Sequence, residues 1–107
     1  MPKYLFEVCY TPAGARGLIE HGGSARRAAI KQSIEAAGGR LEAFYFAFGA
    51  TDAYVIADHV DNVTAAAQAL AVAASGGATV RTVVLLSAEE IDAASGQEVV
   101  YRPPLSP

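Results

Sequence analysis

The side chains that could do chemistry in this sequence are few and scattered. Glu7 and Arg81 stand at odd positions of expected neighbouring strands, so they could form a structural ion pair or anchor a substrate. Tyr45 is a phenol that could donate to a ligand oxygen or simply pack. Arg26 lies near a helix N-terminus, where its guanidinium could reach a bound anion or extend into solvent. Each of these residues is thus a candidate for ligand binding with a structural alternative, and any catalytic residue stays unknown.

The histidines and the cysteine carry weaker signals. His59 ends an expected strand between Asp58 and Asp61, where a carboxylate would favour its protonated form, and we expect a structural or solvated role. His21 precedes a glycine pair, and no function is assigned to it. Cys9 is the single cysteine and lies in an apolar strand pattern, which predicts an unreactive buried thiol.

Motifs that would name a reaction are missing from the sequence. It contains no HxxxH or CxxC spacing, no glycine-rich phosphate loop followed by lysine, and no nucleophile elbow. The glycine pairs at 22–23, 38–39 and 76–77 are typical of helix ends. We therefore expect neither a metal nor a cofactor.

Composition narrows the class of protein. The 107 residues are enough for one domain, 52% of them are hydrophobic and 18% are charged, and the net charge is −3. The eight Lys and Arg residues are dispersed, which argues against nucleic acid as a partner. An early acid, Glu7, and the lack of a long apolar run predict a cytoplasmic chain without a membrane segment.

The elements that must position these residues follow from periodicity and caps. Strands are expected at residues 3–10, 40–48, 52–58 and 79–86, and helices at 12–21, 24–37, 61–75 and 87–94. Thr11, Ser24, Asp61 and Ser87 are the expected N-caps. The order βαββαβ predicts an α+β, ferredoxin-like plait whose antiparallel sheet has the strand order 4-1-3-2. Residues 1–95 would form the domain and residues 96–107 an extended tail.

Strand parity predicts which face each side chain occupies. Even positions should face alanine-rich helices, because large residues complement small ones. In the second helical region, Val63, Ala66, Ala67, Leu70 and Ala74 form one apolar stripe. Odd positions are too apolar for water, so they should meet a second copy in a closed two-sheet barrel. The odd set includes Leu5, Glu7, Cys9, Leu41, Ala43, Tyr45, Ala53, Val55, Ala57, Arg81, Val83 and Leu85.

Several short motifs occur in the order and spacing of a known family. They are Pro2-Lys3-Tyr4, Thr11, Gly38-Gly39, Leu41, Phe44-Tyr45, Gly49, Asp52 and Val80-Arg81-Thr82. Over roughly residues 2 to 94 the chain resembles the GYD-domain family, small proteins without an assigned activity. The resemblance implies a dimeric α/β barrel.

The motif that gives this family its name is altered here. Gly-x-Tyr-Asp becomes Gly49-Ala50-Thr51-Asp52, and the hydroxyl of Thr51 cannot replace a phenol as an acid near neutral pH. Asp52 could brace the hairpin by accepting hydrogen bonds from backbone amides, or it could contact a ligand.

Two functional classes stay open at this point. The first is a small-molecule-binding or regulatory homo-oligomer, which the lack of a catalytic constellation favours. The second is a cofactor-independent oxygenase or isomerase acting on an aromatic or lactone substrate, supported by fold analogy. Within the tail, residues 99–101 favour a strand, which we expect to pair with a sheet edge, preferably that of a neighbouring chain.

Overall fold

The computed structural model describes residues 1–104, which contain four strands and four helices. The elements are β1 (Lys3–Tyr10), α1 (Pro12–His21), α2 (Gly23–Ala36), β2 (Arg40–Phe46), β3 (Ala53–Asp58), α3 (Asn62–Ala74), β4 (Ala78–Leu85) and α4 (Ala88–Ser95). The strands form one antiparallel sheet in the order β2-β3-β1-β4. This confirms the predicted α+β arrangement, because 4-1-3-2 is the same order read from the opposite edge. The sheet is open in the single chain, so the closed barrel stays a prediction.

Three of the four predicted N-caps are confirmed. Ser24 is not a cap, because α2 begins one residue before it and has Gly22 at the N-cap position. Thr11 accepts from the Gly14 amide at 3.2 Å, and Asp61 accepts from the Thr64 amide at 2.9 Å. Ser87 and Glu90 form a reciprocal capping box at the start of α4. At Gly22 the backbone has a φ of +84°, and this left-handed residue separates α1 from α2, which begins at Gly23.

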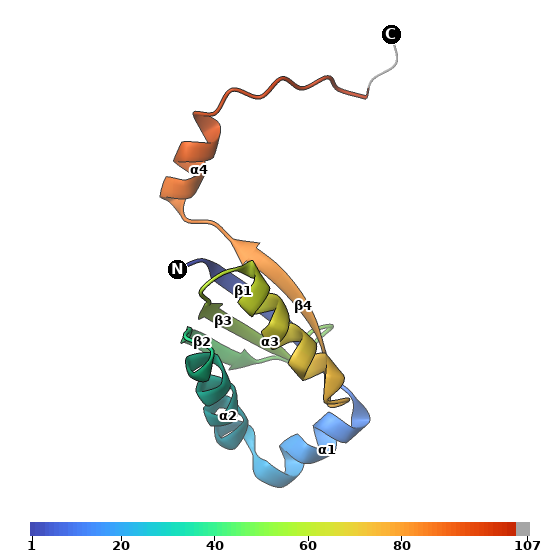
Figure 1. Ribbon diagram of the computed structural model, residues 1–107. Helices are drawn as coiled ribbons and strands as arrows, with labels where there is room; N and C mark the ends of the chain where they lie inside the picture. The colour runs from blue at the N-terminus through green and yellow to red at the C-terminus, as the bar shows by residue number, and fades with distance from the viewer. Residues whose placement is uncertain (105–107) are drawn as a thin grey trace.

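Strand β1 and helix α2 build the core as their patterns predict. Tyr4 and Phe6 are buried on the face that the helices cover, and Ile34 is buried beneath α2. Arg27 and Glu35 point to solvent on the other side of that helix. In Figure 1, α2 and α3 lie across the same face of the sheet, with α2 towards β2 and α3 towards β4.

The face assignment was wrong for β3. Val55 pairs with Phe6, and Ala57 pairs with Tyr4, so the odd residues of β3 lie under the helices. Tyr54 and its even neighbours therefore face the open side. Cross-strand partners share a face, and which parity they carry depends on the connecting loop rather than on the residue number. Ala57 is small and lies beside the large Tyr4 ring of β1. Small and large side chains therefore still complement each other on the covered face, although the parity of β3 is reversed.

Two departures in β2 have local causes. The pairing shifts between Leu41 and Ala43, which marks a bulge, and the extra residue turns Leu41 towards the core instead of the open face. The strand ends at Phe46, two residues earlier than expected, and Phe48 beyond it is fully exposed.

The apolar stripe predicted to pack beneath α3 faces outward. Val63 and Leu70 are 78% and 69% exposed, whereas Ala65 is buried and Ala69 packs against the core. The helix is thus rotated away from the orientation that its largest apolar residues suggest.

The C-terminal segment leaves the body of the domain. Helix α4 and residues 96–104 extend beyond the end of β4 without following an edge of their own sheet (Figure 1). Val100 and Tyr101 are exposed. Pairing of residues 99–101 with their own chain is therefore not observed, and pairing with a neighbour stays a prediction. The predicted tail extends to residue 107, and its last three residues lie outside the described part of the chain.

Candidate functional site

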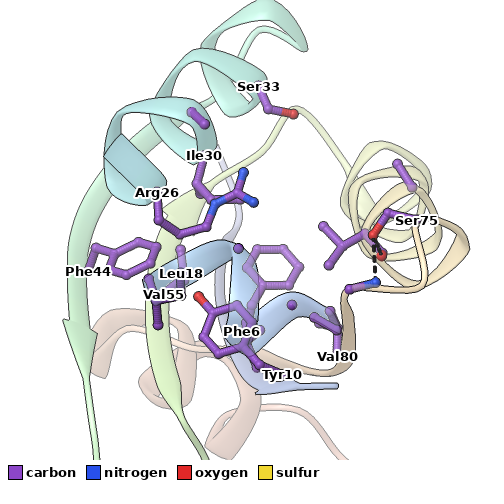
Figure 2. A pocket seen from close by; sticks show the side chains of 18 of the residues that line it. Phe6, Tyr10, Leu18, Arg26, Ile30, Ser33, Phe44, Val55, Ser75 and Val80 are labelled. Carbon is purple, nitrogen blue, oxygen red and sulfur yellow. Dashed lines mark hydrogen bonds between the residues drawn. The ribbon is translucent and has the colours of Figure 1, made fainter. Parts of the chain in front are cut away.

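A cavity of about 570 Å³ lies between the helices and the covered face of the sheet. We call it the α2–α3 cavity, because α2 and α3 form its two sides while α1 closes one end (Figure 2). Its floor is mostly apolar and comes from β1, β2, β3 and β4. The floor side chains are Phe6, Val8, Tyr10, Phe44, Val55, Ala78 and Val80.

The cavity exists because the helices present small side chains to it. Helix α2 contributes Ala25 and Ala29, and α3 contributes Ala69 and Ala71. Methyl groups are too short to fill the space between two helices and a sheet, so the walls stay apart. At one point the helices are bridged, where Gln68 Nε2 donates to Ser33 Oγ at 3.0 Å. The result is an apolar hollow with few polar groups, which is the usual composition of a ligand pocket.

Arg26 supplies the only Asp, Glu, Lys or Arg side chain among the lining residues. It extends from the first turns of α2 over the cavity, as Figure 2 shows. Within residues 1–104 its guanidinium has no ion pair within 4.0 Å and no hydrogen bond. The structure therefore places this predicted binding residue in a cavity and leaves its charge free to interact with a ligand.

Tyr10 is a further polar residue of the cavity, whose lining also includes His21, Ser33, Gln68 and Ser75. Burial raises the pKa of its phenol, while the charge of Arg26 lowers that pKa and the charge of Asp52 raises it. The net direction is upward, so the phenol stays protonated at neutral pH and can donate a hydrogen bond. Tyr10 is at an even position of β1, where the sequence predicts a side chain that faces the helices.

Asp52 positions Tyr10 through the backbone. Its Oδ2 accepts from the Tyr10 amide at 2.8 Å, and its own amide donates to the Val8 carbonyl at 2.9 Å. Its carbonyl in turn accepts from the Ala47 amide at 2.8 Å. Asp52 does accept from a backbone amide, as predicted, but that amide belongs to β1 rather than to the hairpin, so the carboxylate joins the β2–β3 loop to the end of β1. Thr51, at the position of the family tyrosine, directly precedes this brace.

The other three predicted binding residues lie on the opposite, open face of the sheet. Glu7 is directly opposite Arg81 in the β1–β4 register, yet no ion pair within 4.0 Å joins them in the described chain. Tyr45 is 70% exposed on the same face, in edge strand β2. Of the five predicted residues, Arg26 lines the cavity, Asp52 lies in the β2–β3 loop and holds the backbone of Tyr10, and the other three lie on the uncovered face.

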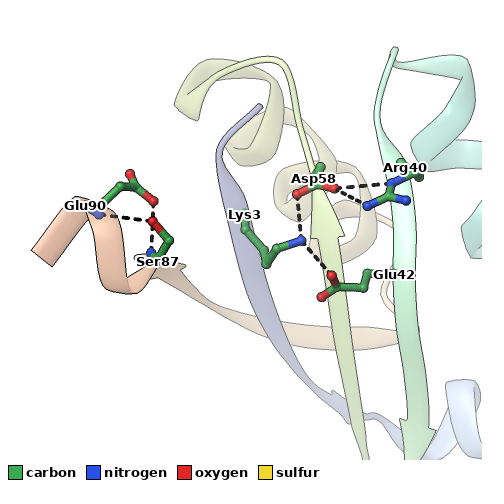
Figure 3. Close-up of polar contacts among 6 residues, drawn as sticks. All are labelled: Lys3, Arg40, Glu42, Asp58, Ser87 and Glu90. Atoms are coloured by element: carbon green, nitrogen blue, oxygen red, sulfur yellow. Dashed lines mark hydrogen bonds and ion pairs between the residues drawn. The ribbon is translucent and has the colours of Figure 1, made fainter.

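Charged residues cluster at one end of the open face (Figure 3). Lys3 Nζ donates to Glu42 Oε1 and to Asp58 Oδ1, each at 2.9 Å, and Arg40 Nη2 donates to Asp58 Oδ2 at 3.2 Å. The hydrogen bond from Lys3, followed by that from Arg40, holds the pKa of Asp58 below its usual value against the opposing effect of burial. This cluster joins three strands, and the sequence analysis did not find it because it depends on register.

His59 is completely buried at the end of β3. Its ring packs edge-on against Phe6, with centroids 5.7 Å apart, and lies 6.0 Å from Tyr4. Neither ring nitrogen has a hydrogen-bond partner among residues 1–104. Burial lowers the pKa of His59, and Asp58 raises it to a smaller degree. The prediction of a structural role agrees with this packing, whereas the expected protonated form does not.

Two searches over residues 1–104 add limits to the site. No group of three or more His, Cys, Asp or Glu side chains is arranged to hold a metal ion there. None of the helices in that part of the chain has the length and apolar character needed to cross a membrane.

Comparison with known proteins identifies the family. The family model described as GYD domain matches residues 4–95, which span most of the chain. The chain therefore belongs to the GYD domain family. No curated protein and no solved structure gives a significant match.

Proposed function

We propose that this GYD-domain chain binds a small molecule in the α2–α3 cavity and acts as a homo-oligomer joined through the open face of its sheet. The main observation that supports the binding proposal is the cavity. Its volume of about 570 Å³ falls within the range of known ligand pockets, about 300–1,000 Å³. Its apolar walls would bury a ligand body, and Arg26 and Tyr10 would fix its orientation.

The cavity can be tested with one residue pair on α3. Ala69 lines the cavity, whereas Ala66 is exposed on the outward side of the same helix. Ala69→Trp should project a large ring into the cavity and weaken binding of the neutral apolar dye N-phenylnaphthylamine by about tenfold or more. Ala66→Trp should leave the affinity within about twofold, because its ring would stay in solvent.

Tryptophan fluorescence supplies an internal control, since the chain has no tryptophan of its own. Emission from Ala69→Trp should be shifted to shorter wavelength than emission from Ala66→Trp. A native mass spectrum of untreated protein would also reveal a retained ligand. Equal dye affinity in both variants, or no dye binding to the wild type, would contradict the cavity as a binding site.

The oligomer proposal is supported by the composition of the open face. Tyr45 and Val83 are exposed there, beside Glu7 and Arg81. A face that carries apolar groups together with an acid and a base can complement itself under two-fold rotation, because each copy supplies both charges. The uncovered sheet would thereby bury its apolar groups.

Val83 and Val84 form a matched pair for this interface. They are neighbours in β4 and are both exposed, but Val83 pairs with Leu5 on the open face and Val84 pairs with Tyr4 on the helix side. We expect sedimentation velocity to show a dimer or larger species for the wild type and for Val84→Glu, and a monomer for Val83→Glu. A monomeric wild type at micromolar concentration would contradict the proposal.

A further inference from the structure

We propose that the ligand of the α2–α3 cavity is an apolar monoanion, an aromatic or aliphatic body bearing one carboxylate that Arg26 and Tyr10 hold. This inference rests on the proposed function, because it assigns the chemical class of the molecule that the cavity binds. It follows from the charge of the walls, the spacing of the polar groups and the position of one nearby acid.

Arg26 is set apart from the other cations by its surroundings. Lys3, Lys31 and Arg40 each have a carboxylate within 4.0 Å. Arg26 and the remaining arginines have no carboxylate partner within residues 1–104, and of these arginines only Arg26 lines the α2–α3 cavity. Arg26 is itself exposed at the cavity. An ion pair gains strength where apolar groups displace water, so a ligand whose apolar body fills the cavity would strengthen its own pairing with this guanidinium.

Tyr10 supplies a donor beside that charge. Its phenol stays protonated, and its O–H donates to no acceptor within residues 1–104, so it is available to a ligand. A guanidinium and a phenol that face one hollow offer several N–H donors and one O–H donor to the two oxygens of a carboxylate. A neutral ligand would leave the guanidinium without an ionic partner.

Asp52 limits the charge that the site can accept. Its carboxylate lies close enough to raise the pKa of Tyr10, and it is held in place by the hydrogen bond from the Tyr10 amide. One arginine opposed by one nearby aspartate favours a single negative charge over the double charge of a phosphate monoester. The site is therefore suited to a carboxylate.

The separation between Arg26 and Ser33, which are polar residues at opposite ends of the cavity, indicates the length of the apolar part of the ligand. Ser33 lies two helical turns beyond Arg26 on α2, about 10 Å along the axis at about 1.5 Å per residue. Ala29 and Ile30 occupy the interval and line the cavity (Figure 2). Ser33 is already hydrogen-bonded to Gln68. The polar groups at that end of the cavity therefore need no hydrogen bond from a ligand. A fused ring system or a medium aliphatic chain fits this interval.

The test compares two dyes that share one skeleton, the neutral N-phenylnaphthylamine and its anionic sulfonate, anilinonaphthalene sulfonate. Arg26→Met removes the charge and keeps much of the side-chain length, and Arg27→Met makes the same change on the solvent side of α2. We expect Arg26→Met to weaken binding of the sulfonate by about tenfold or more and binding of the neutral dye by less than about twofold. Arg27→Met should change neither by more than about twofold.

Two results would separate the failure of this inference from failure of the proposed function. Equal loss of sulfonate affinity in Arg26→Met and Arg27→Met, or no loss in either, would overturn the anion assignment. If the neutral dye still binds in that case, the cavity remains supported as a binding site. If neither dye binds the wild type, or if Ala69→Trp leaves both affinities unchanged, the cavity itself is not a site. Melting temperatures of each variant would confirm folding. A series of aromatic and aliphatic carboxylates should then compete with the sulfonate more strongly than their amides do.

Discussion

Helices α2 and α3 cover the same face of one sheet and are similar in length, but their solvent sides differ in charge. Helix α2 turns Arg27, Lys31 and Glu35 outward, so its own pattern permits a single rotation about its axis. Helix α3 contains no charged residue and exposes Val63 and Leu70. A helix that is apolar all round does not specify which side is buried, so other contacts must do so.

Polar contacts set the rotation of α3. Tyr4 Oη donates to Asn62 Oδ1 at 2.6 Å in the first turn, and Gln68 reaches Ser33 at 3.0 Å near the middle. Ala65 lies between these two anchors and is buried on the same side. The difference between the helices teaches that hydrophobic pattern orients α2, whereas a few hydrogen bonds orient α3.

The largest expected effect contrasts one apolar residue from each helix. Ile34→Ala in α2 removes a side chain that is 1% exposed and should lower the free energy of unfolding by about 3 kcal/mol. Leu70→Ala in α3 should cost less than about 0.5 kcal/mol in the monomer, because that side chain is in solvent. Chemical denaturation of both variants measures the contrast, and similar losses would mean that α3 is rotated differently.

Acidification should have the next largest effect, through His59 at the junction of β3 and α3. Burial holds the folded-state pKa of His59 below the ordinary value of about 6.5. Below that ordinary value the unfolded chain binds a proton that the folded chain does not, so stability falls as pH decreases. The slope is at most about 1.4 kcal/mol per pH unit and ends below the folded pKa.

The pH window distinguishes His59 from nearby acids. The pKa values of Asp58 and Asp61 are lowered in the folded chain, so these groups reduce stability only when pH falls below about 5. His59→Leu should abolish the slope between about pH 6.5 and 5, and replacing the exposed His21 by Gln should preserve it. An unchanged slope in His59→Leu would show that the ring is not buried as a neutral group.

The smallest effect concerns the first anchor of α3. Tyr4→Phe removes the hydroxyl that donates to Asn62 and should cost about 1 kcal/mol, because the remaining partner is exposed and can bind water. Tyr10→Phe provides the comparison, since the Tyr10 phenol has no hydrogen bond within the described chain and its loss should be nearly neutral. Equal costs for the two variants would argue against Asn62 as an orienting contact.

Strand order, caps and the orientation of α2 could be predicted from sequence because each depends on local signals. The alternation of β1 and the N-cap at Asp61 are local in this sense. The faces of β3 and of Leu41 could not be predicted, because a register and a bulge relate residues far apart in the chain. Numerical parity has meaning within one strand and is reset by every loop.

The candidate site was predicted in part for the same reason. Arg26 was found because its helix position is local information, and Asp52 was found through a turn signal. The cavity depends on the gap between two alanine-rich walls, which no single segment encodes. Gln68 could have been recognised as the polar residue of the inward α3 side, but only with the correct rotation of that helix.

One backbone contact also bears on how relatives of this chain can be recognised. A Cβ atom added to Gly14 would collide with the Gly77 carbonyl oxygen, and the amide of Thr11 donates to that same oxygen at 3.0 Å. The start of α1 and the turn before β4 therefore meet main chain to main chain. Such a contact leaves no complementary pair of side chains for an alignment to detect, only a glycine at each end. Variants that acquire a side chain at Gly14 should carry a compensating displacement or a lengthened turn near Gly77, and this joint change is a marker by which divergent members could be traced.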